Sequence, residues 1–141
     1  MKYAGDITPQ QAWQMLSDNP HAVLVDVRTD AEWCFVGVPD LSGLGRQVVY
    51  IEWNRSDGAP NTNFVAELTD RIAPVAADQA ERPVVFICRS GQRSIGAAEV
   101  ATEAGIGPAY NVLDGFEGHL DAQGHRGATG WRAVGLPWKQ G

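Results

Sequence analysis

The chain has 141 residues and a mass of 15.2 kDa, with 44% apolar and 20% charged residues, which is typical of one folded domain with one core. Its formal net charge of −6 and pI near 4.9 argue against a nucleic-acid binder or an anionic-membrane binder, because such surfaces need a basic field. No apolar run approaches the roughly 18 residues of a membrane span, and the N-terminal MKYAGDITPQ lacks a secretory signal. We therefore expect a single cytoplasmic domain over residues 1–141.

Helical and strand patterns alternate along the chain up to residue 115. Thr8 and Pro9 form a helix start, and this helix should end near Asn19 and Pro20. Continuous apolar runs predict buried strands within 21–29, 47–53, 83–88 and 109–115. A polar loop covers 54–61, and further helices are predicted from Thr62 or Asn63 and over 94–105. This alternation predicts a three-layer α/β domain with a mostly parallel sheet.

The segment 115–141 has a different composition. It holds seven of the sixteen glycines, with His119, His125, Trp131 and Trp138 between them. We expect an irregular segment, with one short helix at most, that packs over the domain and is anchored by its tryptophans.

Cys88 lies at a position where ligands bind in α/β proteins. It ends the apolar run 83–88, and the carboxyl ends of parallel strands form the binding edge of such a sheet. The following loop, Arg89-Ser90-Gly91-Gln92-Arg93, leads into a helix whose first N–H groups point back toward the cysteine. The glycine lets the loop curl inward, and the helix end and two guanidinium groups favour a thiolate. The alternative, a buried core cysteine with solvated arginines, is less consistent with this combination.

The motifs along the chain resemble those of the single-domain rhodanese-like sulfurtransferases. Cys88 to Ser94 is similar to their active-site loop, and Asp26-Val27-Arg28 with Glu32-Trp33 is similar to their early signature. The stretch 111–116 and the closing segment 130–138 also resemble that family, so the likeness covers nearly the whole chain. It implies a five-stranded, mostly parallel sheet flanked by helices and a cysteine that carries sulfur as a persulfide.

The resemblance also implies the chemistry of the site. The Cys88 thiolate would take the sulfane sulfur of thiosulfate or of a persulfide and pass it to cyanide, to a thiol or to a protein acceptor. We expect the substrate, a small anionic sulfur donor, to bind at the loop residues Arg89, Ser90, Gly91, Gln92, Arg93 and Ser94. No metal or organic cofactor is expected.

The sequence leaves two alternative functions to consider. A cysteine phosphatase or arsenate reductase needs five residues between its cysteine and its arginine, whereas here position 94 is Ser and Arg93 comes one residue too early. That function ranks low for this reason. A non-enzymatic module that keeps the fold and binds a partner or senses sulfide through Cys88 is the alternative from a different class.

Further polar residues give weaker signals. Asp26 ends a strand beside the proposed site, where it is expected to bond loop N–H groups or to pair with an arginine, with or without a role in the chemistry. We predict that Arg28 and Glu32 form a structural pair. Cys34 is interpreted as a structural thiol and not as a resolving partner of Cys88, since the spacing does not bring the two together. His21, His119 and His125 lack metal-ligand spacing; a place for His119, His125 and Asp121 at the mouth of the site is the weaker alternative.

Overall fold

The structure is a computed structural model that describes residues 3–19, 21–55, 58–72, 82–118, 120, 122–125, 127 and 129–139. Its main sheet has five strands in the order β1-β6-β5-β2-β4, and each neighbouring pair is parallel. The strands are β1 (Gly5–Ile7), β2 (Val23–Asp26), β4 (Val49–Tyr50), β5 (Val84–Ile87) and β6 (Ala109–Val112). The α/β fold predicted from the sequence, with a five-stranded parallel sheet, is confirmed.

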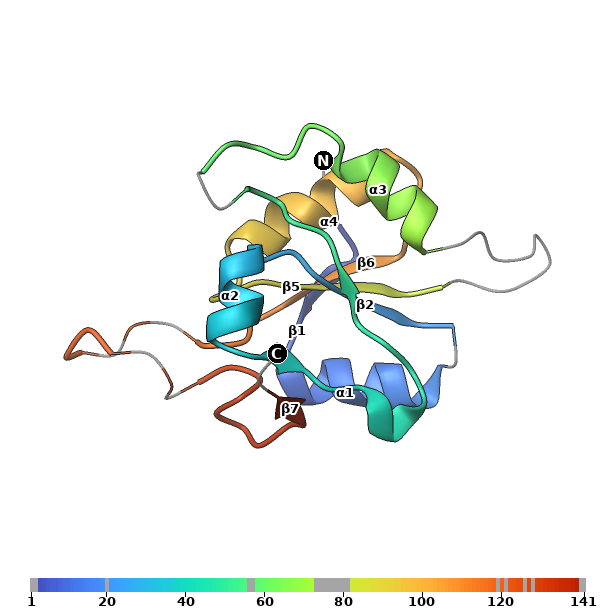
Figure 1. Ribbon diagram of the computed structural model, residues 1–141. Coiled ribbons are helices and arrows are strands. Elements are labelled where there is room, and N and C mark those ends of the chain that lie inside the picture. The colour runs from blue at the N-terminus through green and yellow to red at the C-terminus, as the bar shows by residue number, and fades with distance from the viewer. Residues whose placement is uncertain are drawn as a thin grey trace.

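Helices cover both faces of this sheet (Figure 1). Helix α1 (Pro9–Asp18) lies on one face, and α3 (Phe64–Arg71) and α4 (Arg93–Glu103) lie on the other. The short helix α2 (Asp30–Phe35) lies beside the carboxyl ends of β2 and β5. These layers leave that edge of the sheet bordered by loops, which is where the predicted site lies.

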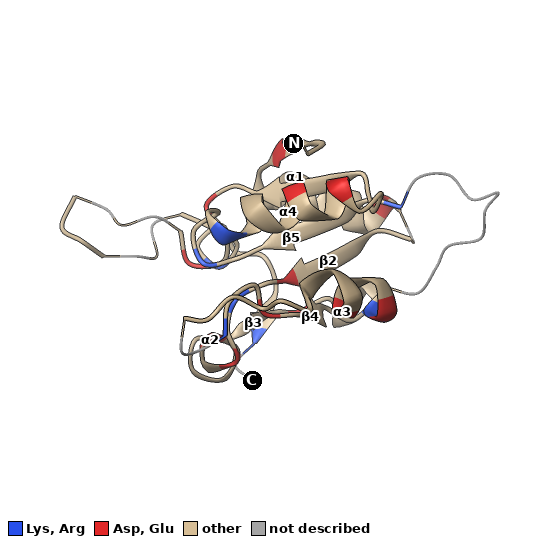
Figure 2. Cartoon of the chain, turned by 90° about the horizontal axis from the view of Figure 1, so that it is seen from above, with Lys and Arg blue, Asp and Glu red and all other residues tan. Residues whose placement is uncertain are grey.

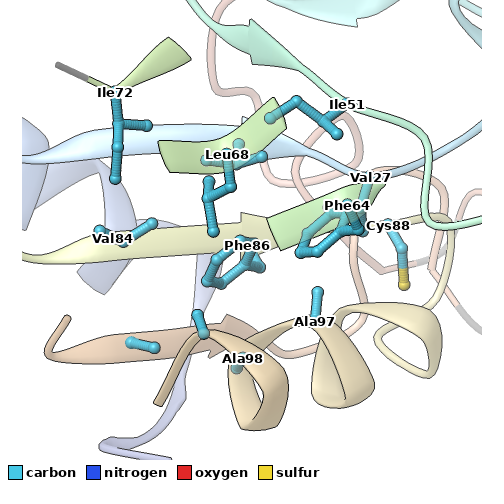
Figure 3. Packing of buried hydrophobic residues seen from close by; sticks show 13 residues of the cluster. Val27, Ile51, Phe64, Leu68, Ile72, Val84, Phe86, Cys88, Ala97 and Ala98 are labelled. Atoms are coloured by element: carbon cyan, nitrogen blue, oxygen red, sulfur yellow. The ribbon is translucent and has the colours of Figure 1, made fainter. Parts of the chain in front are cut away.

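The side chains of strand β5 alternate between two hydrophobic clusters, one on each face of the sheet. Val84, Phe86 and Cys88 belong to the cluster under α3 and α4, whereas Val85 and Ile87 belong to the cluster under α1. Successive side chains of a strand point to opposite faces, so a strand covered on both sides must be apolar throughout. Figure 3 shows the first cluster, in which Phe86 faces Phe64 and Leu68, and Cys88 lies at the end of the row.

Local signals explain where the helices begin and end. Thr8 caps α1 through a capping box with Gln11, and the helix ends before Asn19, as predicted. Helix α3 begins after Asn63, as predicted, but the side chain of Asn63 is not a cap. Asn61 supplies the local contact instead, because its Oδ1 accepts from the Asn63 N–H at 3.0 Å.

Several short elements are missing from the sequence prediction. These are β1, α2, the 3-10 helix Ser42–Leu44, and a small antiparallel pair of β3 (Val38–Pro39) and β7 (Trp138–Lys139). Helix α2 had a readable signal, since Thr29 and Glu32 form a capping box. The two-residue strands carry no periodicity that a sequence pattern can reveal.

The C-terminal segment 115–141 packs on the core through Phe116 and Trp131. Trp131 is completely buried in the α1 cluster, and its indole N–H donates to the Pro137 carbonyl at 2.8 Å. Trp138 lies in β7 with 39% of its surface exposed. The described part of 115–141 consists of turns and this strand, without the short helix that the sequence allowed.

Residues of both charge signs lie along the described helices. Figure 2 shows a basic segment at the start of α4, where Arg93 lies, and acidic segments further along the same helix, where Glu99 and Glu103 lie. Within the described residues, no helix is long and apolar enough to cross a bilayer.

Replacing Trp131 by Ala is expected to lower the free energy of unfolding by about 3–5 kcal/mol, because the indole is completely buried. Trp138→Ala is the matched control and should cost less than about 2 kcal/mol, since this side chain is 39% exposed. Urea unfolding followed by circular dichroism measures both. Equal losses would show that the segment is not held mainly by Trp131.

Candidate active site

Cys88 follows β5 directly and is 1% exposed. Its sulfur lies beside the start of α4 (Figure 3), where the Gly91 N–H donates to Sγ at 3.1 Å and the Ser94 Oγ lies 3.2 Å away. A donated N–H stabilises a negative sulfur more than a neutral one. The geometry is therefore that of a loop folded around the thiol.

Two local features shape this loop. Gly91 has a φ of 96°, a conformation that side chains other than glycine rarely adopt. Helix α4 then begins at Arg93, and in the described part of the chain the Gln92 side chain makes no capping hydrogen bond. The open N-terminus of this 11-residue helix is the positive end of its dipole and favours a negative charge nearby.

The turn after β6 holds the backbone of Cys88 and Arg89. The Phe116 N–H donates to the Cys88 carbonyl at 2.8 Å, and the Glu117 N–H donates to the Arg89 carbonyl at 2.9 Å. Gly115 makes this approach possible, because a Cβ there would collide with both of those residues. The motif at 111–116 thus fixes the start of the loop.

An ion pair ties α2 to the start of α4. The Arg93 guanidinium donates to both carboxylate oxygens of Glu32, at 2.8 and 3.0 Å. Burial alone would raise the pKa of Glu32. Hydrogen bonds from Arg93 and from the Thr29 N–H have the larger effect and lower this pKa to about 2. Burial lowers the pKa of Arg93, and the bonds to Glu32 outweigh this and raise it. The predicted pair of Arg28 with Glu32 is wrong, because Arg93 takes that carboxylate.

Asp26 and Arg28 form a separate, fully buried pair. The Arg28 Nη2 lies 2.7 Å from the Asp26 Oδ2 and also donates to the Gly37 carbonyl at 2.7 Å. The guanidinium carbon lies 4.3 Å from the centre of the Phe116 ring. Asp26 pairs with an arginine, as one of the two expectations had it, and its Oδ1 also accepts from the backbone N–H of Arg28 at 3.1 Å. The pair supports the turn that holds the loop.

Asn111 lies next to the site, although the sequence analysis did not predict it as a site residue. It lies in β6, is 1% exposed, and accepts a hydrogen bond from the Ser94 hydroxyl. Its Nδ2 donates to the Asp6 Oδ1 at 3.0 Å. An amide at a buried position of the run AYNV is the signal that marks it, because buried polar groups need partners.

The structure brings some of the predicted residues together and leaves others apart. Cys88, Gly91 and Ser94 are in contact, and Arg93 precedes Ser94 at the start of α4, where it pairs with Glu32. Arg89 and Gln92 are exposed, and Ser90 is half-buried. Their roles toward a substrate stay predictions.

The remaining thiol and the histidines lie elsewhere or outside the description. Cys34 is exposed on α2, and both cysteines are free. His21 and His125 are exposed, and His119 and Asp121 lie outside the described residues. Among the described residues, no three His, Cys, Asp or Glu side chains are grouped so that they would hold a metal ion.

Comparisons with known proteins place these features in a family. The family model for the STR4 middle domain matches residues 4–141. The thiosulfate sulfurtransferase GlpE of Glaesserella parasuis is 31% identical over 120 residues, which cover 84% of this chain and 88% of GlpE.

Two solved structures have the same fold. The crystal structure of Rv0390 from M. tuberculosis is 76% identical and superposes with a TM-score of 0.90, covering 99% of this chain and 100% of Rv0390. The polysulfide-sulfur transferase homodimer of Wolinella succinogenes is 25% identical with a TM-score of 0.57, covering 95% of this chain and 77% of that one. With the family model and GlpE, these matches show that the chain belongs to the rhodanese-like family.

Proposed function

We propose that this protein is a sulfurtransferase that moves a sulfane sulfur through a persulfide on Cys88. The donor is a small anion such as thiosulfate or a persulfide, and the acceptor is cyanide, a thiol or a thiol of another protein. The observation that carries the proposal is the position of the Cys88 sulfur, at the carboxyl end of β5, with the Gly91 N–H directed at it and the start of α4 beside it. The name of the GlpE relative supports thiosulfate as a donor.

In the first half-reaction, the Cys88 thiolate attacks the sulfane sulfur of thiosulfate. A bond forms between Sγ and this sulfur, and the sulfur–sulfur bond of thiosulfate breaks with its electron pair leaving on sulfite. The product is an anionic Cys88 persulfide. We expect the Gly91 N–H and the N-terminus of α4 to stabilise its negative charge.

In the second half-reaction, the acceptor attacks the outer sulfur of the persulfide. With cyanide, a carbon–sulfur bond forms, the persulfide bond breaks, and its electron pair returns to Cys88 as the thiolate. Thiocyanate leaves, and no proton or external electron is required. The two half-reactions share one site, so the kinetics should be of the ping-pong type.

Treatment with thiosulfate is expected to add one sulfur to the protein, about 32 Da for a persulfide on the reactive thiol. Intact-protein mass spectrometry measures this gain, which should disappear after cyanide is added. Cys34→Ser should still gain the sulfur, whereas Cys88→Ser should not.

A protein that gains no sulfur from thiosulfate or from an organic persulfide contradicts the proposal. That result would favour the module that binds a partner or senses sulfide through Cys88. If the gain in mass persists in Cys88→Ser and is lost in Cys34→Ser, the sulfur is carried by Cys34, and this result also contradicts the proposal.

The charges around the loop should set the preference for anionic donors. Glu32→Gln removes the carboxylate that neutralises Arg93, so the KM for thiosulfate should fall several-fold, about the effect of one charge near a protein surface. Arg89→Ala removes a positive charge and should raise this KM by a similar factor. An organic persulfide without a sulfonate group should respond less to both changes in steady-state assays. Equal effects on the two donors would show that neither residue acts through the sulfonate group of thiosulfate.

A further inference from the structure

A chain of hydrogen bonds runs from the surface of the sheet to the Cys88 sulfur. Asp6 is exposed on β1 and lies beside Asn111 in the strand register. The Asn111 Nδ2 donates to the Asp6 Oδ1 at 3.0 Å, and the Ser94 hydroxyl donates to the Asn111 Oδ1. The Ser94 Oγ lies 3.2 Å from the Cys88 Sγ, and either atom of this last pair has the geometry of a donor.

Asp6 sets the direction of the inner bonds. A carboxylate only accepts hydrogen bonds, so the Asn111 side chain must turn its NH₂ group toward Asp6. Its carbonyl oxygen then faces Ser94 and needs a donor, because Asn111 is 1% exposed. The Ser94 hydroxyl supplies that donor.

Ser94 has one hydroxyl proton and two neighbours that compete for it. While the proton points to Asn111, the Ser94 Oγ faces the sulfur as an acceptor, which suits a Cys88 thiol that donates its own proton. A Cys88 thiolate has no proton and needs a donor. The hydroxyl must then rotate to the sulfur, which leaves the buried Asn111 oxygen without a partner.

We propose that Asn111 is a positioning residue that competes with the Cys88 thiolate for the hydroxyl proton of Ser94. Asp6 enforces this competition by fixing the Asn111 amide. The free thiolate is thereby disfavoured, while the Gly91 N–H, which donates to the sulfur at 3.1 Å, favours it.

The competition has a use in sulfur transfer, and this consequence rests on the proposed function. In a persulfide the charge lies on the outer sulfur, and the inner Sγ carries neither proton nor full charge. Ser94 can then keep its bond to Asn111, so the network disfavours the thiolate relative to the persulfide. A less stabilised thiolate is also the more basic nucleophile toward the donor.

Other charged groups lie on the elements around Cys88 and are unchanged in the variants at Asn111 and Ser94. Arg89 and Arg93 lie on the loop and the start of α4, and Glu32 of α2 pairs with Arg93. The buried pair of Asp26 and Arg28 lies after β2, next to β5. The turn after β6 adds Asp114 and Glu117, whose backbone approaches the loop.

The ultraviolet absorbance of the thiolate, titrated against pH in a Cys34→Ser background, tests the proposal. The same titration of Cys34→Ser/Cys88→Ser provides the blank. Asn111→Val leaves Ser94 free to donate to the sulfur, so the midpoint should fall by about one pH unit, a tenfold gain in thiolate. Asp6→Ala removes the acceptor of the Asn111 NH₂ group, which lets the amide turn over and should lower the midpoint in the same direction.

The Ser94→Ala background separates this mechanism from a general disturbance. Without the hydroxyl, Asn111→Val should no longer move the midpoint, and Asp6→Ala should keep only the small effect of its lost charge. Tyr110→Phe, the neighbouring change on the opposite face of β6, should leave the midpoint unchanged.

An unchanged or higher midpoint in Asn111→Val would overturn the proposal, as would a shift of the same size with and without Ser94. The titration needs no sulfur donor. Failure of sulfur transfer and failure of this inference are therefore separate results.

Discussion

The close contact between two backbone segments determines the geometry of the site. The turn after β6 donates hydrogen bonds to the carbonyls of Cys88 and Arg89, and only a glycine at 115 allows this approach. The turn after β6 thus holds the backbone of Cys88, and the loop that follows Cys88 surrounds its sulfur. The buried pair of Asp26 and Arg28 supports the same turn through the ring of Phe116. These contacts fix the backbone of Cys88 and Arg89, while the Gly91 N–H donates to the sulfur itself.

The long apolar strands and helices could be predicted from the sequence because each is governed by its own periodicity and caps. Strand β5 and helix α1 are examples, since a continuous apolar run and a capping box decide them locally. The pair of β3 and β7 could not be predicted in this way. Each strand has two residues, and their pairing joins Val38 to Lys139, a contact that only the folded chain creates.

Some residues of the site could likewise be predicted from the sequence, and others could not. Cys88 and its glycine turn are readable because they are contiguous and lie at the end of a strand. The partners of the charged residues could not be predicted in this way. Glu32 was expected to pair with Arg28, but it pairs with Arg93, which lies 61 positions away. Asp6 meets Asn111 through the parallel register of β1 and β6, and Ser94 reaches Asn111 from helix α4. Gly91 and Ser94 next to the thiol were therefore predictable, whereas Asn111 and Asp6 behind Ser94 were not.

A crystal structure of the protein after exposure to thiosulfate tests the central claim most directly. We predict an additional sulfur bonded to the Cys88 Sγ and surrounded by the loop of residues 89–93, with the bond between Ser94 and Asn111 retained. Cys34 should be unmodified. An unmodified Cys88, or sulfur attached to Cys34 instead, would contradict the account of Cys88 as the sulfur carrier.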